Sequence, residues 1–355
     1  MPIPLHVEDR GEGDWQGPIQ GEFARPFAAD DAPARCILLR LPGRTVLSLT
    51  FFHPMADGRS GTALMRDLLR AALRGGAVKA VAQVPPPMHA AFPSAFRWGD
   101  QPERARDLAQ QIAEDALIRG TPADVPFLAH REPRREPRLT TIRLNAAHGR
   151  RLQERCRAER TTVHGAVCAA QLIATNGLFA DEAARTLYLI CPADLRGQVT
   201  ADLSGQLSFC STLVRSTFLV EGPQAFWSLA REVSADLRRR LDRGDGHMTY
   251  ASLPLERIGG SGPAFDGFAA ALDHMPAGSN VSNIGRVEPL DDCPEVTAIS
   301  FALCAMPKHV ASLNASSYRD ELIVNMTFDA AKLQPATADA IAAEVSALLE
   351  KAAGD

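Results

Sequence analysis

The residues best suited to chemistry lie in one short segment, Phe-Phe-His53-Pro-Met-Ala-Asp57-Gly58. A neutral imidazole such as that of His53 can take a proton from a hydroxyl or amine that attacks a carbonyl. Asp57 could orient the ring or brace the turn, and Gly58 would permit a close approach that a side chain forbids. The spacing alone is also typical of an ordinary packed histidine beside a turn dipeptide.

The elements on either side predict a sharp change from strand to helix at this segment. Residues 35–41 and 45–52 are two β-rich runs separated by Pro42-Gly43-Arg44, which favours a hairpin. Beyond Gly58, apolar residues recur at helical spacing, and Ser60 could cap that helix. His53 would therefore be held rigidly where the strand ends and the helix begins.

The remainder of the chain predicts an α/β protein with mixed sheets covered by helices. A breaker-rich region contains one helix at 102–118, and regular alternation follows it. We expect strands at 139–144, 187–191, 206–214, 280–284, 295–303, 309–316 and 321–328, and helices after Asn145, after Thr161 or Thr162, at 223–241 and at 336–352.

Composition excludes several classes of protein. With 355 residues, 46% apolar content and a net charge of -4, the chain can bury a large core but has no charge pattern for nucleic acid or an anionic membrane. We therefore expect small neutral partners. The beginning of the sequence lacks a signal peptide, and no stretch is long and apolar enough to cross a bilayer, so we predict a cytoplasmic protein without a transmembrane segment.

The seven cysteines are scattered, with no CxxC pair and no histidine at the spacing of a metal site. We interpret most of them as small buried residues and predict no metal. His164, on an apolar helix, is interpreted as a packing residue. The cysteines are Cys36, Cys156, Cys168, Cys191, Cys210, Cys293 and Cys304.

The segment around His53 resembles the HHxxxDG signature of the condensation-domain and chloramphenicol-acetyltransferase-like superfamily. His53 matches the second histidine, which is the catalytic base in that superfamily, and Asp57 matches its structural aspartate. Further segments resemble family landmarks in the same order, and the layout is most similar to the polyketide-associated acyltransferases like phthiocerol/phthiodiolone dimycocerosyl transferase. These segments are 24–27, 62–68, 191–196, 205–209 and 280–285.

The resemblance implies a two-lobed fold, with an N-terminal lobe at 1–120, a crossover linker at 121–138 and a C-terminal lobe at 139–355. It implies acyl transfer from a coenzyme A or acyl-carrier-protein thioester to an alcohol or amine, without a covalent acyl-enzyme, a bound cofactor or a metal. Arg196 would be the salt-bridge partner of Asp57. Ser282 and Asn283 would face the reaction channel and donate to the oxyanion.

Two departures from the family pattern leave alternatives open. Phe52 stands where the family has its first histidine, and the family usually has a further strand and helix upstream, so we expect an N-terminal lobe that is truncated. One alternative is therefore a non-catalytic protein that binds a carrier protein or an acyl chain. Another is thioester hydrolysis, in which water replaces the acceptor.

Overall fold

The computed structural model describes residues 3–11, 14–28, 30–76, 88–126, 135–181, 183–203, 206–252, 270, 275–306 and 308–354. Gly205 and residues 127–134 of the expected linker lie outside this set. No helix in the described ranges is both long and apolar enough to cross a bilayer.

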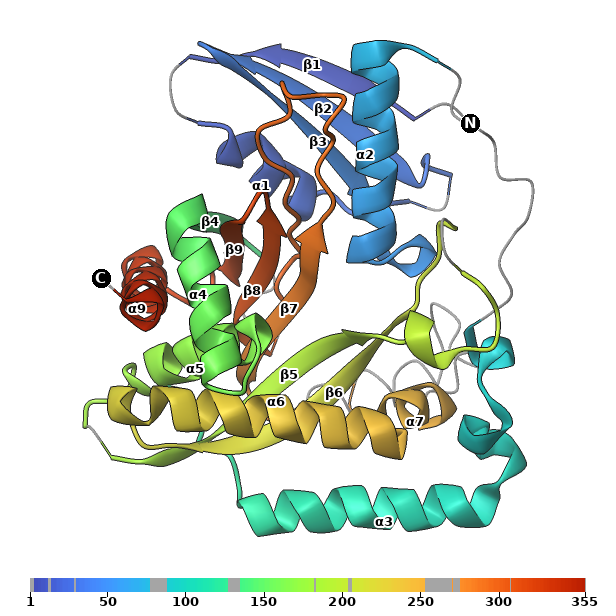
Figure 1. Ribbon diagram of the computed structural model, residues 1–355, viewed down its shortest axis with the longest axis vertical. Helices are drawn as coiled ribbons and strands as arrows, with labels where there is room; N and C mark the ends of the chain where they lie inside the picture. Colours follow the sequence, from blue (N-terminus) through green and yellow to red (C-terminus); the bar gives the residue numbers. More distant parts are fainter. Residues whose placement is uncertain are drawn as a thin grey trace.

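A small sheet built from the N-terminal part of the chain carries the strand that leads to His53. Its strands are β1 (Leu5–Asp9), β2 (Ala34–Leu41) and β3 (Arg44–Phe51), in that order; β1 is parallel to β2, and β2 and β3 form the expected antiparallel hairpin. The helices α1 (Gln16–Ala24) and α2 (Gly58–Arg74) accompany this sheet. Figure 1 shows it in blue at the top, with α2 beside it.

A mixed six-stranded sheet forms the larger part of the molecule. Its order is β4-β9-β8-β7-β5-β6, with β5 parallel to β7, β7 parallel to β8, and the other pairs antiparallel. The α/β architecture with mixed sheets is therefore confirmed. The strands are β4 (Pro137–Leu144), β5 (Arg185–Asp194), β6 (Ser211–Val220), β7 (Gly278–Val287), β8 (His309–Tyr318) and β9 (Glu321–Asp329).

Helices cover one face of the large sheet and bury the main apolar core (Figure 1). Within α5, every residue from Gly165 to Asn176 is buried, as expected for its apolar sequence. Asn145 and Thr162 cap α4 and α5 through side-chain oxygens that accept backbone N–H groups. The helices of this part are α3 (Pro102–Arg119), α4 (Ala146–Ala158), α5 (Val163–Asn176), α6 (Phe226–Arg243), α7 (Asp245–Ser252) and α9 (Pro335–Ala353).

Short 3-10 helices occupy several of the connections. They are η1 (His53–Met55), η2 (Met88–Ala91), η3 (Ser94–Phe96), η4 (Trp98–Asp100), η5 (Arg196–Gln198) and η6 (Pro223–Ala225). The first of them contains the candidate base, and the fifth contains Arg196.

The face of the large sheet that points away from the helices is polar although it is buried. Side chains alternate along a strand, so Leu313 and Val324 join the core while Asn314 and Asn325 point to the other face. The segment 300–303 lies against that face, where Asn325 Nδ2 donates to the Phe301 carbonyl at 2.8 Å.

Three local expectations from the sequence are wrong. Residues 295–303 form no strand, because side chains of β9 rather than a neighbouring strand bind the carbonyls of this segment. Strand β6 begins at Ser211 instead of 206, because residues 208–210 bind the turn at Asp57 through their backbone. Asp57, not Ser60, caps α2, since its carboxylate accepts the Ser60 N–H at 3.0 Å.

Candidate active site

The His53 turn, residues 53–58, connects β3 to α2. Phe51 ends the strand, a single 3-10 turn contains His53, and Asp57 caps the helix that begins at Gly58. The backbone closes this turn because Ala56 N donates to the His53 carbonyl at 3.2 Å. A strand end and a helix cap therefore fix the imidazole from both sides.

The imidazole of His53 has a defined tautomer. Its Nδ1 lies 3.0 Å from the Ala56 carbonyl oxygen. A carbonyl only accepts hydrogen bonds, so Nδ1 carries a hydrogen, and in the neutral ring Nε2 is then the nitrogen with the lone pair. The side chain is exposed, and the edge of the Phe209 ring packs against it with centroids 5.1 Å apart. In its neutral form, His53 thus has Nε2 as the nitrogen that can accept a proton, as a general base requires.

The carboxylate of Asp57 forms a bidentate ion pair with Arg196. The Arg196 guanidinium donates to Oδ2 at 2.7 Å and to Oδ1 at 3.1 Å, and Asp57 is 5% exposed. Burial by itself would lower the pKa of Arg196, but the hydrogen bond and charge of Asp57 outweigh it and raise that pKa. The pair therefore fixes the turn rather than exchanging protons.

Backbone and hydroxyl groups complete the binding of this carboxylate. Cys210 N donates to Asp57 Oδ2 at 2.9 Å, and Asp57 N donates to the Ser208 carbonyl at 3.3 Å. Arg196 also donates to Ser60 Oγ at 2.8 Å, which in turn donates to the Ser208 carbonyl at 2.9 Å. Ser208 and Cys210 were missed from sequence, because residues 206–210 match a strand pattern that conceals their role, and Ser60 was interpreted only as a helix cap.

Gly58 lies where the first turn of α2 approaches a different part of the chain. A Cβ at this position would lie 2.9 Å from Ile284 Cγ2 and 3.2 Å from ring carbons of Phe301. Any side chain would therefore push α2 away from β7 and from the segment that follows it. Glycine therefore permits a close approach between α2 and these side chains.

Ser282 and Asn283 lie on β7 close to this contact, but they do not act as a pair. Consecutive strand residues point to opposite faces, so the two side chains cannot both enter one channel from a regular strand. Ser282 is buried on the polar face. Asn283 Oδ1 accepts the Gly285 N–H at 2.7 Å, beside an irregularity in the strand pairing. This hydrogen bond leaves the amide Nδ2 of Asn283 as the possible donor.

Phe52, which replaces the first histidine of the motif, points away from this network. Phe52 is 48% exposed, and the centroid of its ring lies 6.0 Å from that of the Phe27 ring. On the Phe27 ring, Arg35 Cζ lies 4.0 Å from the centroid. An aromatic contact thus stands where the family pattern has a histidine.

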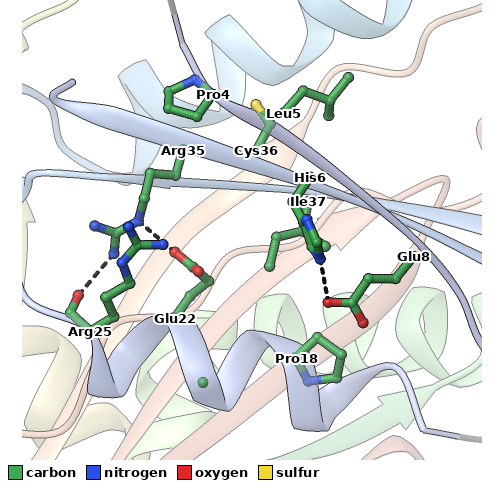
Figure 2. Close-up of a pocket in the computed structure, with 11 residues that line it drawn as sticks. Pro4, Leu5, His6, Glu8, Pro18, Glu22, Arg25, Arg35, Cys36 and Ile37 are labelled. Atoms are coloured by element: carbon green, nitrogen blue, oxygen red, sulfur yellow. Dashed lines mark hydrogen bonds and ion pairs between the residues drawn. The ribbon is translucent and has the colours of Figure 1, made fainter. Parts of the chain in front are cut away.

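The larger of two cavities described for the molecule lies away from His53. It measures about 520 Å³ and opens between α1, β1 and β2. Figure 2 shows Arg35 in its wall, where the guanidinium donates to Glu22 at 2.7 Å and to the Arg25 carbonyl at 2.8 Å. Neither cavity has His53 in its wall, so these cavities do not provide the enclosed passage that the resemblance implied.

Within the described ranges, one group of potential metal ligands comes together, and it lies away from the His53 turn. His164, Cys168 and Cys191 bring one nitrogen and two sulfurs within 4.8 Å of one another. Sequence reasoning assigned His164 to packing, although its spacing of four residues from Cys168 places both on one helix face.

A family model describes the larger part of the chain. Residues 133–330 match the phthiocerol/phthiodiolone dimycocerosyl transferase C-terminus. Because this match covers more than half of the sequence, the protein belongs to this family of acyltransferases. Comparison with curated protein sequences finds no significant match.

Solved structures of a condensation domain, an acetyltransferase and an epimerization domain share the fold. The first condensation domain of the CDA synthetase superposes with a TM-score of 0.69 at 16% identity, over 100% of this chain and 76% of that one. The trichothecene 15-O-acetyltransferase from Fusarium sporotrichioides gives 0.67 at 12% identity, over 98% and 76%. The epimerization domain from the third module of tyrocidine synthetase B gives 0.65 at 13%, over 99% and 80%.

Proposed function

We propose that this acyltransferase uses His53 as a general base to move an acyl group from a thioester to an alcohol or amine. The donor would be acyl-coenzyme A or an acylated carrier protein, and the acceptor a small molecule. The observation that carries the proposal is the hydrogen bond from His53 Nδ1 to the Ala56 carbonyl, because it leaves Nε2 free to accept a proton.

The reaction that this geometry supports needs no covalent acyl-enzyme. Nε2 takes the proton of the acceptor, and the acceptor oxygen or nitrogen forms a bond to the thioester carbonyl carbon. The carbon–sulfur bond then breaks, and the protonated imidazole returns the proton to the departing thiolate. We propose the amide Nδ2 of Asn283 as a donor to the oxyanion of the intermediate.

The test of the base is His53→Gln, which keeps the size of the side chain but removes its basic nitrogen. Loss of a general base costs roughly a hundredfold to ten-thousandfold, so we expect kcat to fall by that factor without a change in melting temperature. His6→Gln is the matched control, since His6 is an exposed histidine of the same small sheet. Activity of His53→Gln within threefold of the unmodified protein would refute the mechanism.

One assay with several donors identifies the acyl donor and distinguishes acyl transfer from the two alternative functions, hydrolysis and non-catalytic binding. The same acyl group is presented on coenzyme A and on a carrier protein, with and without a set of alcohols and amines. Formation of an ester or amide identifies acyl transfer. The donor that gives faster product formation is the preferred donor. Release of free acid at the same rate without an acceptor indicates hydrolysis, and donor binding without any product indicates the non-catalytic alternative. The cytoplasmic location stays a prediction.

A further inference from the structure

The His164 cluster, defined as His164, Cys168 and Cys191, lies between α5 and β5 in the apolar core. Cys168 is 0% exposed and Cys191 4% exposed. His164 and Cys168 are one helical turn apart on α5, and Cys191 faces them from the strand. The acyl-transfer scheme above uses none of these three residues.

Two of the three distances within the His164 cluster are close to those of ligands around one metal ion, and the third is no more than 4.8 Å. Cys168 Sγ lies 3.5 Å from His164 Nε2 and 4.0 Å from Cys191 Sγ. Zinc–sulfur bonds of about 2.3 Å and zinc–nitrogen bonds of about 2.0–2.1 Å at tetrahedral angles separate the ligand atoms by about 3.5–3.8 Å. Only small side-chain movements would therefore be needed to enclose an ion.

The three side chains are poorly satisfied by one another in the absence of an ion. The contacts that His164 Nε2 and the two thiols make are weak hydrogen bonds to sulfur. Buried polar groups normally find strong partners, so a cluster of this kind in an apolar core needs an explanation.

We propose that the His164 cluster is a structural zinc site. Two thiolates and a neutral imidazole balance the charge of Zn²⁺, so the bound site is neutral and can be buried. Thiolate and imidazole ligands also match the preference of zinc. A water molecule would complete the four ligands of the ion.

The zinc ion would stabilise the strand that leads to the candidate active site. Cys191 lies three residues before Asp194, the last residue of the strand, and Arg196, which binds Asp57, lies two residues after it. A metal that joins α5 to β5 would hold the end of this strand in place. This role does not depend on which acyl donor or acceptor the enzyme uses.

The first test measures zinc in protein produced with zinc in the medium and purified without chelators. We expect about one zinc per chain, and a loss of at least roughly tenfold in Cys168→Ser, Cys191→Ser and His164→Gln. Cys156→Ser is the matched control, because Cys156 is buried on α4 outside the cluster. Zinc-free unmodified protein, or equal loss in the control, would overturn the proposal.

The second test needs no variant and therefore remains decisive if the substitutions prevent folding. X-ray absorption of the zinc-loaded, unmodified protein should show two sulfur ligands at about 2.3 Å and nitrogen or oxygen at about 2.0–2.1 Å. A shell of nitrogen and oxygen alone would contradict the assignment. A purified protein with a Cys168–Cys191 disulfide and no zinc would instead make the two thiols a redox pair.

Discussion

Two histidines of this protein illustrate how surroundings decide what an imidazole can do. His53 is exposed at the end of a strand, and a backbone carbonyl fixes its tautomer so that Nε2 is free. His164 lies on the most deeply buried helix, and its Nε2 contacts the sulfur of Cys168 instead. The surroundings of the first fit the proposed general base, and those of the second fit the proposed zinc ligand.

The supporting groups of the two sites differ in the same way. Around His53, a charged pair and backbone N–H groups hold the turn, and they come from segments about 140 residues apart. Around His164, the ligands come from one helix and one neighbouring strand. The placement of the His53 turn thus depends on polar contacts between distant segments. The placement of the His164 cluster depends on packing in the core. Substitutions in the two regions should therefore act differently.

After loss of His53 itself, the largest expected effect is that of Arg196→Ala. This change leaves the buried carboxylate of Asp57 without its cation, which typically costs about 3–5 kcal/mol of the free energy of unfolding. Activity should fall as well, because the turn that holds His53 loosens. Urea denaturation and turnover measure the two effects.

A matched exposed pair and a double variant sharpen this prediction. Arg70 also binds a carboxylate through two nitrogens, that of Asp292, but both side chains are nearly half exposed. Arg70→Ala should leave the free energy of unfolding almost unchanged. Adding Asp57→Asn to Arg196→Ala should recover part of the stability, because the buried charge is then gone. No recovery would show that the ion pair is not the cause.

Gly58→Ala should have the next largest effect. The new Cβ would overlap Ile284 and approach Phe301, so α2 must shift, at a cost of about 1–3 kcal/mol in stability and with a lower kcat. Gly21→Ala on α1 is the control, since a Cβ there meets nothing and alanine favours the helix. Equal effects of the two substitutions would argue against a steric role for Gly58.

Stability should decrease as the pH falls from about 6.5 to 4 because of His309 at the start of β8. Burial lowers the pKa of His309 to about 4, and Nδ1 accepts the Met306 N–H, which requires the unprotonated ring. Between pH 6.5 and 4 the unfolded chain binds more protons, so acid favours unfolding, by an amount of order 2 kcal/mol. The free energy of unfolding, measured at several pH values, should therefore change less with pH in His309→Gln than in the unmodified protein. An identical pH dependence in both proteins would contradict this.

Thr162→Ala should give the smallest effect, a loss of about 1 kcal/mol. The hydroxyl of Thr162 accepts the Gly165 N–H at 3.0 Å and so begins the helix that carries His164. Thr162→Ser keeps this hydroxyl and should match the unmodified protein in thermal unfolding. A loss of stability in the serine variant would assign the effect to the methyl group.

Local patterns in the sequence were sufficient for much of the fold. The hairpin of β2 and β3 followed from two β-rich runs around Pro42-Gly43, and the caps at Asn145 and Thr162 followed from their side chains. Expectations failed at 206–210 and 295–303, where apolar residues suggest strands. Their backbone groups bind distant side chains, and such long-range partners leave no periodic signal.

The sequence by itself determined the residues of the turn, His53, Asp57 and Gly58, because their order along a strand-to-helix change follows from local propensities and a short motif. Only the tertiary structure decided which nitrogen of His53 is free, how Ser60, Ser208 and Cys210 enclose Asp57, and that His164 meets two sulfurs. The physical reason is the range of the interactions. Hydrogen bonds and metal ligation act over about 2–4 Å in space, whatever the separation along the chain.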